Sequence, residues 1–266
     1  MTPEGPNAER AKSEGDGLGR GRNFPVDDGT ESESPTKRAL VLPDGIRFPE
    51  RDELTGPRAE RERLWARIGR ANLRSGFVSR VSTEPEFAVF AEANVDAPAL
   101  WSVLVTLVRA LLPAGVDSCQ LLLGDADSEL EPIAWDSAAH WLETLEPYAH
   151  RLVHDAWVQF GLVDDGGGKV SGVLVTPTKH LQIWAQSREK LVEILKSIGL
   201  DELSELELLA GYPVVLEPLD VATEAAPSLE ELFAKLRGDE EGPADELDEN
   251  SFEDAAEDAA EKPAED

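Results

Sequence analysis

The sequence has 266 residues and a formal net charge of −29, with 54 Asp and Glu against 25 Lys and Arg. A surface this negative repels DNA, RNA and anionic lipid, so we expect no nucleic-acid or membrane partner and favour a basic protein, although solubility alone would explain the same charge. The longest apolar run, residues 97–112, is interrupted by polar side chains, and no apolar run of signal-peptide length stands near the start.

Both ends of the chain have compositions that are typical of disorder. Residues 1–57 are rich in Gly, Pro, Ser and charged side chains and show no sustained period. Residues 239–266 hold fourteen Asp or Glu and one Lys, with only Leu247 and Phe252 as large apolar side chains. Because such segments cannot bury enough apolar surface to offset the entropy of ordering, we predict a disordered N-terminal arm over 1–57 and a disordered acidic tail over 239–266.

Residues 58–76 are predicted to form a basic amphipathic helix. The stretch 58–74 has six Arg and two Glu, and Leu64, Trp65 and Ile68 fall at helical spacing. We expect these apolar side chains to pack on the domain that follows. A nucleic-acid role fits poorly with the charge of the whole chain, and contact with the acidic tail in cis is left open.

Residues 77–220 are predicted to form one α+β core domain. The order strand, helix, strand between 87 and 123 favours parallel pairing of the two strands, so we expect a mixed sheet with helices mainly on one face. Short apolar runs rich in β-branched residues give the strands, and apolar residues at helical spacing give the helices. The expected strands are 87–95, 116–123, 158–163, 171–176, 180–186, 206–209 and 214–216, and the expected helices are 97–112, 137–145, 147–157 and 188–198.

A linker and a short acidic amphipathic helix are predicted over 221–238. Ser228 and Glu231 have the spacing of a capping box, and the residues after them place an apolar stripe on one side. This helix either docks on its own domain or serves as a detachable partner-binding helix.

The hairpin across Thr-Pro-Thr-Lys at 176–179 carries the predicted binding face. In the second strand, His180, Gln182 and Trp184 alternate with Leu181 and Ile183, so one face is apolar and the other carries His, Gln and Trp. An aromatic residue between polar groups suits protein recognition. The alternative is that a helix covers this face and Trp184 belongs to the core. The predicted partner-binding residues are Trp184, Gln182, His180, Lys179 and Trp157, with Asp125, Asp127, Glu129, Asp164 and Asp165 as charge partners on loops.

The sequence offers little catalytic chemistry. It has neither a G-x-S-x-G elbow nor a phosphate-binding P-loop, and we predict no catalytic residue and no cofactor. His150 and His154 share one helix face at the spacing of zinc ligands, with Asp155, His140 or His180 as possible third ligands. Arg151 stands where a metalloprotease would have Glu, which disfavours a metal. The single cysteine, Cys119, lies in a strand-like run and suits a reducing cytoplasm.

The stretches DAW at 155–157, FG at 160–161 and KHLQIW at 179–184 carry a resemblance. They resemble small bacterial α/β proteins of the immunity or uncharacterised accessory type, over residues 87–219. This resemblance implies a non-enzymatic cytoplasmic binding protein, such as an immunity-type inhibitor that captures a basic toxin. One alternative is an acidic chaperone or scaffold that acts through its C-terminal tail. A second is a metal-dependent enzyme built on His150 and His154.

Overall fold

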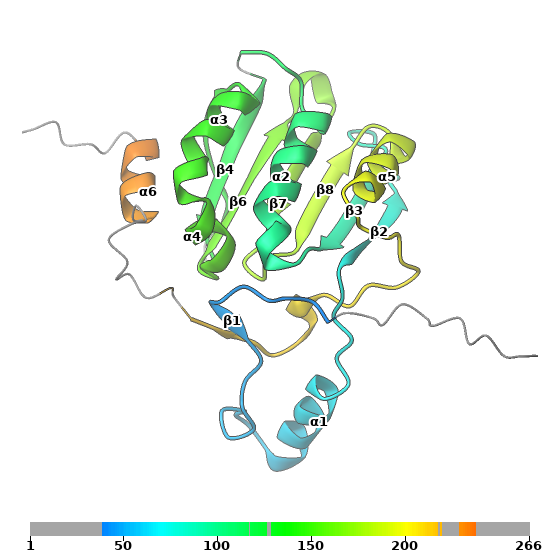
Figure 1. The fold of residues 1–266 in the computed structure, drawn as a ribbon, viewed down its shortest axis with the longest axis vertical. Coiled ribbons are helices and arrows are strands. Elements are labelled where there is room, and N and C mark those ends of the chain that lie inside the picture. The colour runs from blue at the N-terminus through cyan, green and yellow to red at the C-terminus, as the bar shows by residue number, and fades with distance from the viewer. Residues whose placement is uncertain (1–38, 117, 127–128, 218, 220–228, 238–266) are drawn as a thin grey trace, which may run out of the picture. The chain divides into compact units, whose positions relative to one another are not determined.

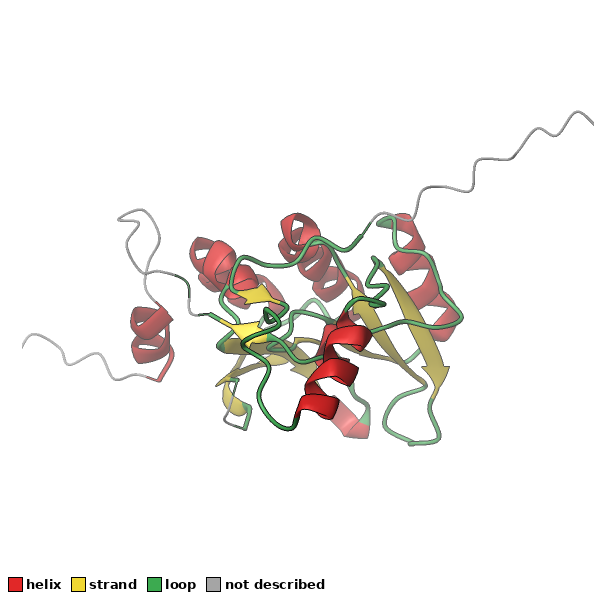
Figure 2. Ribbon diagram, turned by 90° about the horizontal axis from the view of Figure 1, so that it is seen from below, coloured by secondary structure: helices red, strands yellow, loops and turns green. Residues whose placement is uncertain are grey.

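One seven-stranded sheet forms the centre of the fold, and the computed structural model describes residues 39–116, 118–126, 129–217, 219 and 229–237 of the chain. The strand order is β2-β3-β8-β7-β6-β4-β5, and every paired strand in it is antiparallel. The helices α2 to α5 lie against one face of this sheet (Figure 1), and Figure 2 shows them along one side of the strand layer. The bounds of the strands are β2 (Gly76–Val81), β3 (Val89–Asn94), β4 (Cys119–Asp125), β5 (Glu131–Asp136), β6 (Val158–Asp164), β7 (Ser171–Val175) and β8 (Leu181–Ala185).

The α+β class and the helices on one face are therefore confirmed, but the sheet is antiparallel, not mixed. The strands β3 and β4 run in the same direction and flank α2 (Ala97–Leu111), as the sequence suggests. They are not neighbours, because β8, β7 and β6 lie between them. Two later hairpins, β6–β7 and β7–β8, fill this gap and supply antiparallel partners.

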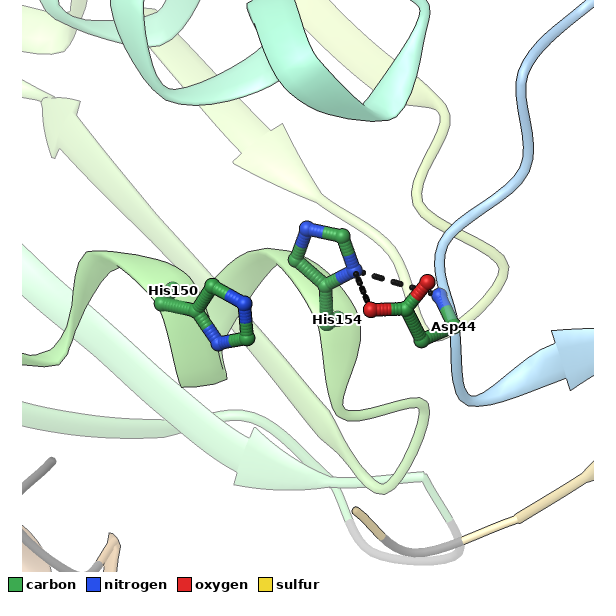
Figure 3. Close-up of side chains that lie close together, drawn as sticks. All are labelled: Asp44, His150 and His154. Atoms are coloured by element: carbon green, nitrogen blue, oxygen red, sulfur yellow. Dashed lines mark hydrogen bonds and ion pairs between the residues drawn. The ribbon is translucent and has the colours of Figure 1, made fainter. Parts of the chain in front are cut away.

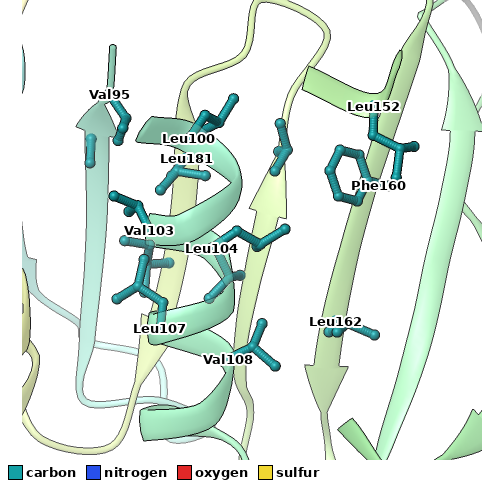
Figure 4. Packing of buried hydrophobic residues seen from close by; sticks show 14 of the residues in the cluster. Val95, Leu100, Val103, Leu104, Leu107, Val108, Leu152, Phe160, Leu162 and Leu181 are labelled. Carbon is teal, nitrogen blue, oxygen red and sulfur yellow. The ribbon is translucent and has the colours of Figure 1, made fainter. Parts of the chain in front are cut away.

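The main core lies between the sheet and α2 to α5. The apolar side of α2 buries Leu100, Leu104 and Leu107, each 2% exposed or less, over the strands beneath. Figure 4 shows α2 lying over the strands, with Leu100 next to Leu181 of β8 and Phe160 of β6 farther along the same layer. The remaining helices of this layer are α3 (Ala138–Leu145), the 3₁₀ turn η1 (Glu146–Tyr148), α4 (Ala149–His154) and α5 (Arg188–Ser197).

Side-chain hydrogen bonds cap some of the helices but not all of them. The Ser137 and Ser187 hydroxyls cap α3 and α5 by accepting the N–H groups of His140 and Lys190. Asp96 precedes α2 but does not cap it, because its carboxylate accepts the N–H of Val41 at 2.8 Å. The predicted helix over 147–157 is shorter, since η1 takes its start and α4 ends at His154.

Residues 39–57 belong to the folded protein, which corrects the prediction that the N-terminal arm extends to 57. The strand β1 (Ile46–Arg47) pairs with β9 (Val215–Leu216) in a separate two-stranded sheet. Ile46 packs with Leu73, Ala156 and Leu209 in a small second core. Composition missed this because the apolar residues of 39–48 bury against distant segments, not against one another. Residues 1–38 and 239–266, where disorder is also predicted, lie outside the described residues.

The two peripheral helices differ from each other. The basic helix α1 (Arg58–Ile68) ends earlier than 76 and has no fully buried residue. Leu64 and Ile68 are half-buried, whereas Trp65 is 39% exposed, so the expected packing does not hold for Trp65. Arg67 instead lies 5.0 Å over the Tyr212 ring. The helix α6 (Leu229–Arg237) docks on the main core through Leu229 and Leu232. Docking on the domain, one of the two predicted alternatives, is thus what this helix does.

Candidate functional site

The sheet face opposite α2 to α5 forms two cross-strand rows of side chains, which we call the open face. Strand register places seven residues side by side in each row. The first row is Arg80, Phe90, Trp184, Gly172, Val163, Gln120 and Trp135. The second row is Val78, Glu92, Gln182, Leu174, Gly161, Leu122 and Pro132.

The centre of the open face is aromatic. The rings of Phe90 and Trp184 lie 5.6 Å apart at an interplanar angle of 49°, a geometry that favours aromatic pairs. Both side chains are only half-buried, and Trp135 at the edge of the sheet is 40% exposed. The alternative prediction, in which a helix covers this face and makes Trp184 a core residue, does not hold for the described chain.

Polar groups flank the aromatic pair on the side of β2. Arg80 lies 3.4 Å from Glu92, and the exposed fractions of the two side chains are 70% and 16%. Gln182 is half-buried next to them and faces Glu92 in the register. The open face thus combines an apolar centre with a polar margin, which is the composition of protein interfaces.

Lys179 and His180 do not belong to the open face, contrary to the prediction from the alternating pattern. They precede β8 in the turn after β7, and they are 3% and 6% exposed. Lys179 has a positive φ of 59°, which turns its side chain out of the strand alternation. Its ammonium group donates to the carbonyls of Leu152 and Val158 at 2.9 and 2.6 Å.

Burial changes the titration of both residues. It lowers the pKa of Lys179 to about 7, while the carboxylate of Asp155 acts in the opposite direction. Burial also lowers the pKa of His180 to about 4. The His180 Nδ1 atom lies 2.8 Å from the Thr176 hydroxyl, and its Nε2 atom is buried without a hydrogen-bond partner in the described chain. These groups hold the turn in place and offer no surface to a partner.

The other predicted partner-binding residues are split between the two ends of the sheet. Trp157 is 41% exposed and lies beside Asp125, because the N–H of Ala126 donates to the Trp157 carbonyl at 2.8 Å. Asp164 ends β6 at the opposite end, followed by Asp165. Glu129 is exposed after the β4 turn, and Asp127 lies outside the described residues. The predicted residues therefore do not gather around Trp184.

A cluster of possible metal ligands lies at the end of α4 (Figure 3). Asp44, His150 and His154 each offer one ligand atom, and these atoms lie within 4.8 Å of one another. The third member comes from the segment before β1. It is none of the predicted third ligands, because Asp155 and His180 are buried and His140 is on α3.

The groups around His154 shift its pKa in opposite directions. Partial burial lowers the pKa of this histidine, and His150 and Lys179 act in the same direction, while Asp44 opposes them. Arg151, which the sequence suggests as a cation beside the ligands, is buried at 6% exposed, whereas His150 is exposed.

The single cysteine is an inert core residue, as expected from its strand-like surroundings. Cys119 is fully buried at the start of β4. Burial raises the pKa of its thiol to about 11, and the carboxylates of Asp164 and Asp136 act in the same direction. The thiolate form is therefore scarce at neutral pH.

Sequence reasoning missed Phe90, Trp135 and Asp44. Phe90 lies in a predicted strand, and period-two alternation from Val89 would have placed it on the open face. Trp135 lies on β5, a strand that the sequence analysis did not predict. Asp44 is 106 residues before His150 in the chain, and no local spacing links the two.

Comparison with known proteins gave no relative for this chain: no family model, no curated protein and no solved structure matches it. Among the described residues, no helix has the length and apolar character needed to cross a membrane.

Proposed function

We propose that this chain is a non-enzymatic protein-binding module and that its open face captures a basic partner. The single observation that carries the proposal is the Phe90–Trp184 pair, which stays half-exposed at the centre of a sheet. Aromatic residues at the centre of a surface supply most of the binding energy of protein interfaces. The sheet face supports them rigidly, so their ordering on binding costs little entropy.

The apolar surface around this pair also supports the proposal. Val163, Leu122 and Trp135 continue the rows toward β5, and each remains half-buried or exposed. The solvent face of an antiparallel sheet normally carries alternating polar residues. An apolar patch in that position is typical of an interaction site.

Charge supports a basic partner. The described residues from 118 to 237 carry 18 acidic side chains against 8 basic ones, whereas residues 39–116 carry ten of each. The negative charge is thus concentrated in the half of the domain that contains β4 to β8. Such a field speeds the encounter with a positively charged protein, while the aromatic centre determines how long the complex lasts.

An immunity-type inhibitor of a basic toxin is the specific form of this function that we propose. Its partner would be a folded basic domain that presents an apolar knob to Phe90 and Trp184. Trp157 is a second exposed tryptophan, but it lies at the far end of β6, so we assign it no role in the same contact.

Capture by the full chain tests the proposal. The wild-type chain, Trp184→Ala and Trp65→Ala are immobilised and exposed to lysate at about 0.3 M salt, which screens weak surface attraction. Trp65 is the matched control because it is 39% exposed on α1, outside the open face. We expect the wild type and Trp65→Ala to retain one basic protein, and Trp184→Ala to bind it at least about thirtyfold more weakly, as for a hot-spot residue.

A fourth protein separates the open face from the acidic tail. A chain that ends at residue 237 should keep the partner if the open face binds it. Binding that survives Trp184→Ala but disappears with residues 238–266 would contradict the proposal and assign capture to the tail, as in the chaperone alternative.

A further inference from the structure

The outer side of α4 presents two histidines together. His150 and His154 are one helical turn apart, and their rings stack at 4.5 Å with an interplanar angle of 13°. His150 is exposed, and the side chain of His154 is 17% exposed. Histidines one helical turn apart are a common half of a transition-metal site, and rotation of the exposed His150 ring out of the stack would let a nitrogen of each ring face one ion.

Asp44 is held against these histidines by the backbone. The N–H of Gly45 donates to the His154 carbonyl at 3.1 Å, and the Gly45 carbonyl accepts the N–H of Glu217 at 2.8 Å. A Cβ atom at position 45 would lie 2.5 Å from the His154 carbonyl oxygen and 2.6 Å from that of Glu217. Only glycine allows this approach, so the chain brings Asp44 to the end of α4 through a specific contact.

The contacts of His154 Nδ1 make opposite demands on that atom. It lies 3.1 Å from the Asp44 N–H, which requires a lone pair, and 3.0 Å from the Asp44 Oδ2 atom, which requires a proton. A neutral imidazole satisfies only one of them. When Nδ1 accepts the N–H, its one lone pair is occupied, and no proton lies between Nδ1 and the carboxylate oxygen 3.0 Å away. A cation that replaces this hydrogen bond would be bound by both atoms.

We propose that Asp44, His150 and His154 bind a divalent transition-metal ion, with Zn²⁺ as the ion that fits this donor set. Two nitrogens and one carboxylate oxygen are zinc ligands, whereas Mg²⁺ and Ca²⁺ prefer six or more oxygens. Zinc bonds of about 2.0–2.2 Å need the three ligand atoms closer together than 4.8 Å. The exposed side chains of Asp44 and His150 supply this adjustment by rotation.

The ion would fasten the segment before β1 to α4. That segment otherwise rests on the small second core and on a few backbone hydrogen bonds. Three protein ligands leave a fourth position of the tetrahedron for water or for a donor atom of a partner. The site is independent of the open face, since its three residues lie outside both cross-strand rows.

Zinc affinity of the full chain tests this site. The metal-free wild type, Asp44→Asn and His150→Gln are titrated with Zn²⁺ in competition with a chromogenic chelator. Both substitutions change exposed side chains, so the folded protein should remain and can be verified by circular dichroism. We expect one tight equivalent in the wild type and affinities at least about tenfold lower in the two variants.

The matched control changes a histidine that lies beside an aspartate elsewhere in the chain. His140 lies 3.7 Å from Asp136 at the start of α3, outside the proposed site. His140→Gln should bind Zn²⁺ within about twofold of the wild type. Visible absorption of Co²⁺ adds a second readout, because the ion absorbs more strongly at a low coordination number than in water. We expect these bands in the wild type and their loss in Asp44→Asn and His150→Gln. Equal Zn²⁺ affinities in all four proteins would overturn the proposal and mean that acidic side chains elsewhere bind the ion.

Discussion

The two faces of the seven-stranded sheet are made by the same strands, yet they have different environments. Ile183 and Val173 face the helices and are fully buried, while Trp184, the residue after Ile183, is half-buried on the other side. The alternation of side chains assigns successive residues to opposite faces, although Leu174 of the open face is also buried, at 7% exposed. It does not make the open face polar, because Phe90, Trp184, Val163 and Trp135 form one cross-strand row.

The difference shows which residues the fold needs and which remain available for function. The side chains on the face that the helices cover form the main core. Folding alone therefore explains why that face is apolar. The apolar side chains of the open face lose much less contact with water. Their retention in a solvent-facing position therefore needs another explanation, and binding is the one that we propose.

The largest effect is expected on the covered face. Phe160 is 1% exposed in the main core, so Phe160→Ala should lower the free energy of unfolding by about 3–5 kcal/mol. Trp184→Ala, which removes a larger side chain from the open face, should cost clearly less. Urea unfolding of both variants measures this, and equal losses would mean that the two faces do not differ as described.

Close packing of the strands gives the next effect. A Cβ atom at position 172 would lie 2.7 Å from Val163 Cγ2 and 2.9 Å from the Leu162 carbonyl. We expect Gly172→Ala to destabilise the protein by about 1–3 kcal/mol. In the control Gly69→Ala the nearest atom is an ordinary 3.6 Å away, and a change of at most about 0.5 kcal/mol is expected. A neutral Gly172→Ala would show that the sheet has room on its open face.

The buried turn before β8 should make stability depend on pH. Because the pKa of His180 is about 4 in the folded protein and ordinary in the unfolded chain, the unfolded chain binds more protons between pH 6.5 and 4. Stability is therefore lost as the pH falls through this window, by about 2–3 kcal/mol. His180→Asn should reduce this loss of stability, and the part that remains comes from the carboxylates, which still titrate. An unchanged pH profile of the unfolding midpoint would contradict the assigned burial.

Lys179 should act at higher pH with the same sign. Its folded pKa of about 7 lies below that of a lysine in the unfolded chain. The unfolded chain then binds more protons from about pH 7 to about pH 10, so this residue makes stability rise across that range. Lys179→Met should flatten the rise, measured as urea midpoints at pH 7 and pH 9. A profile of the variant that is parallel to that of the wild type would place the ammonium group in water.

The smallest effect on stability is expected at the margin of the open face. Trp135 is 40% exposed on the edge strand β5, so Trp135→Ala should change the free energy of unfolding by less than about 1 kcal/mol. The same variant should weaken capture of the basic partner, because it shortens the aromatic row. Full capture by a stable variant would restrict the binding surface to β3 and β8.

Local patterns predicted much of the fold. The hairpin of β7 and β8, the caps Ser187 and Ser137, and the end of α5 at Gly199 all depend on residues that are close in sequence. Gly199 has a φ of 85°, which residues other than glycine rarely adopt. A glycine at this position is a common signal for the end of a helix, so the sequence itself marks where α5 ends.

Distant pairings could not be predicted in the same way. The insertion of β8, β7 and β6 between β3 and β4 depends on hairpins that follow later in the chain. Asp44 reaches His154 only because Gly45 fits between two carbonyl groups from separate segments. The burial of Lys179 follows from one residue with positive φ, which shifts the alternation that the sequence suggests.

Oxidative footprinting of tryptophans in the full chain tests most directly that the open face is free to bind. Hydroxyl radicals modify side chains according to their contact with solvent, and mass spectrometry compares Trp184 with two internal standards: buried Trp141, 5% exposed, and exposed Trp157, 41% exposed. We expect Trp184 to react clearly faster than Trp141, at a rate between the two standards. A Trp184 that is as protected as Trp141 would contradict the account, because the open face would then already be covered in the isolated protein.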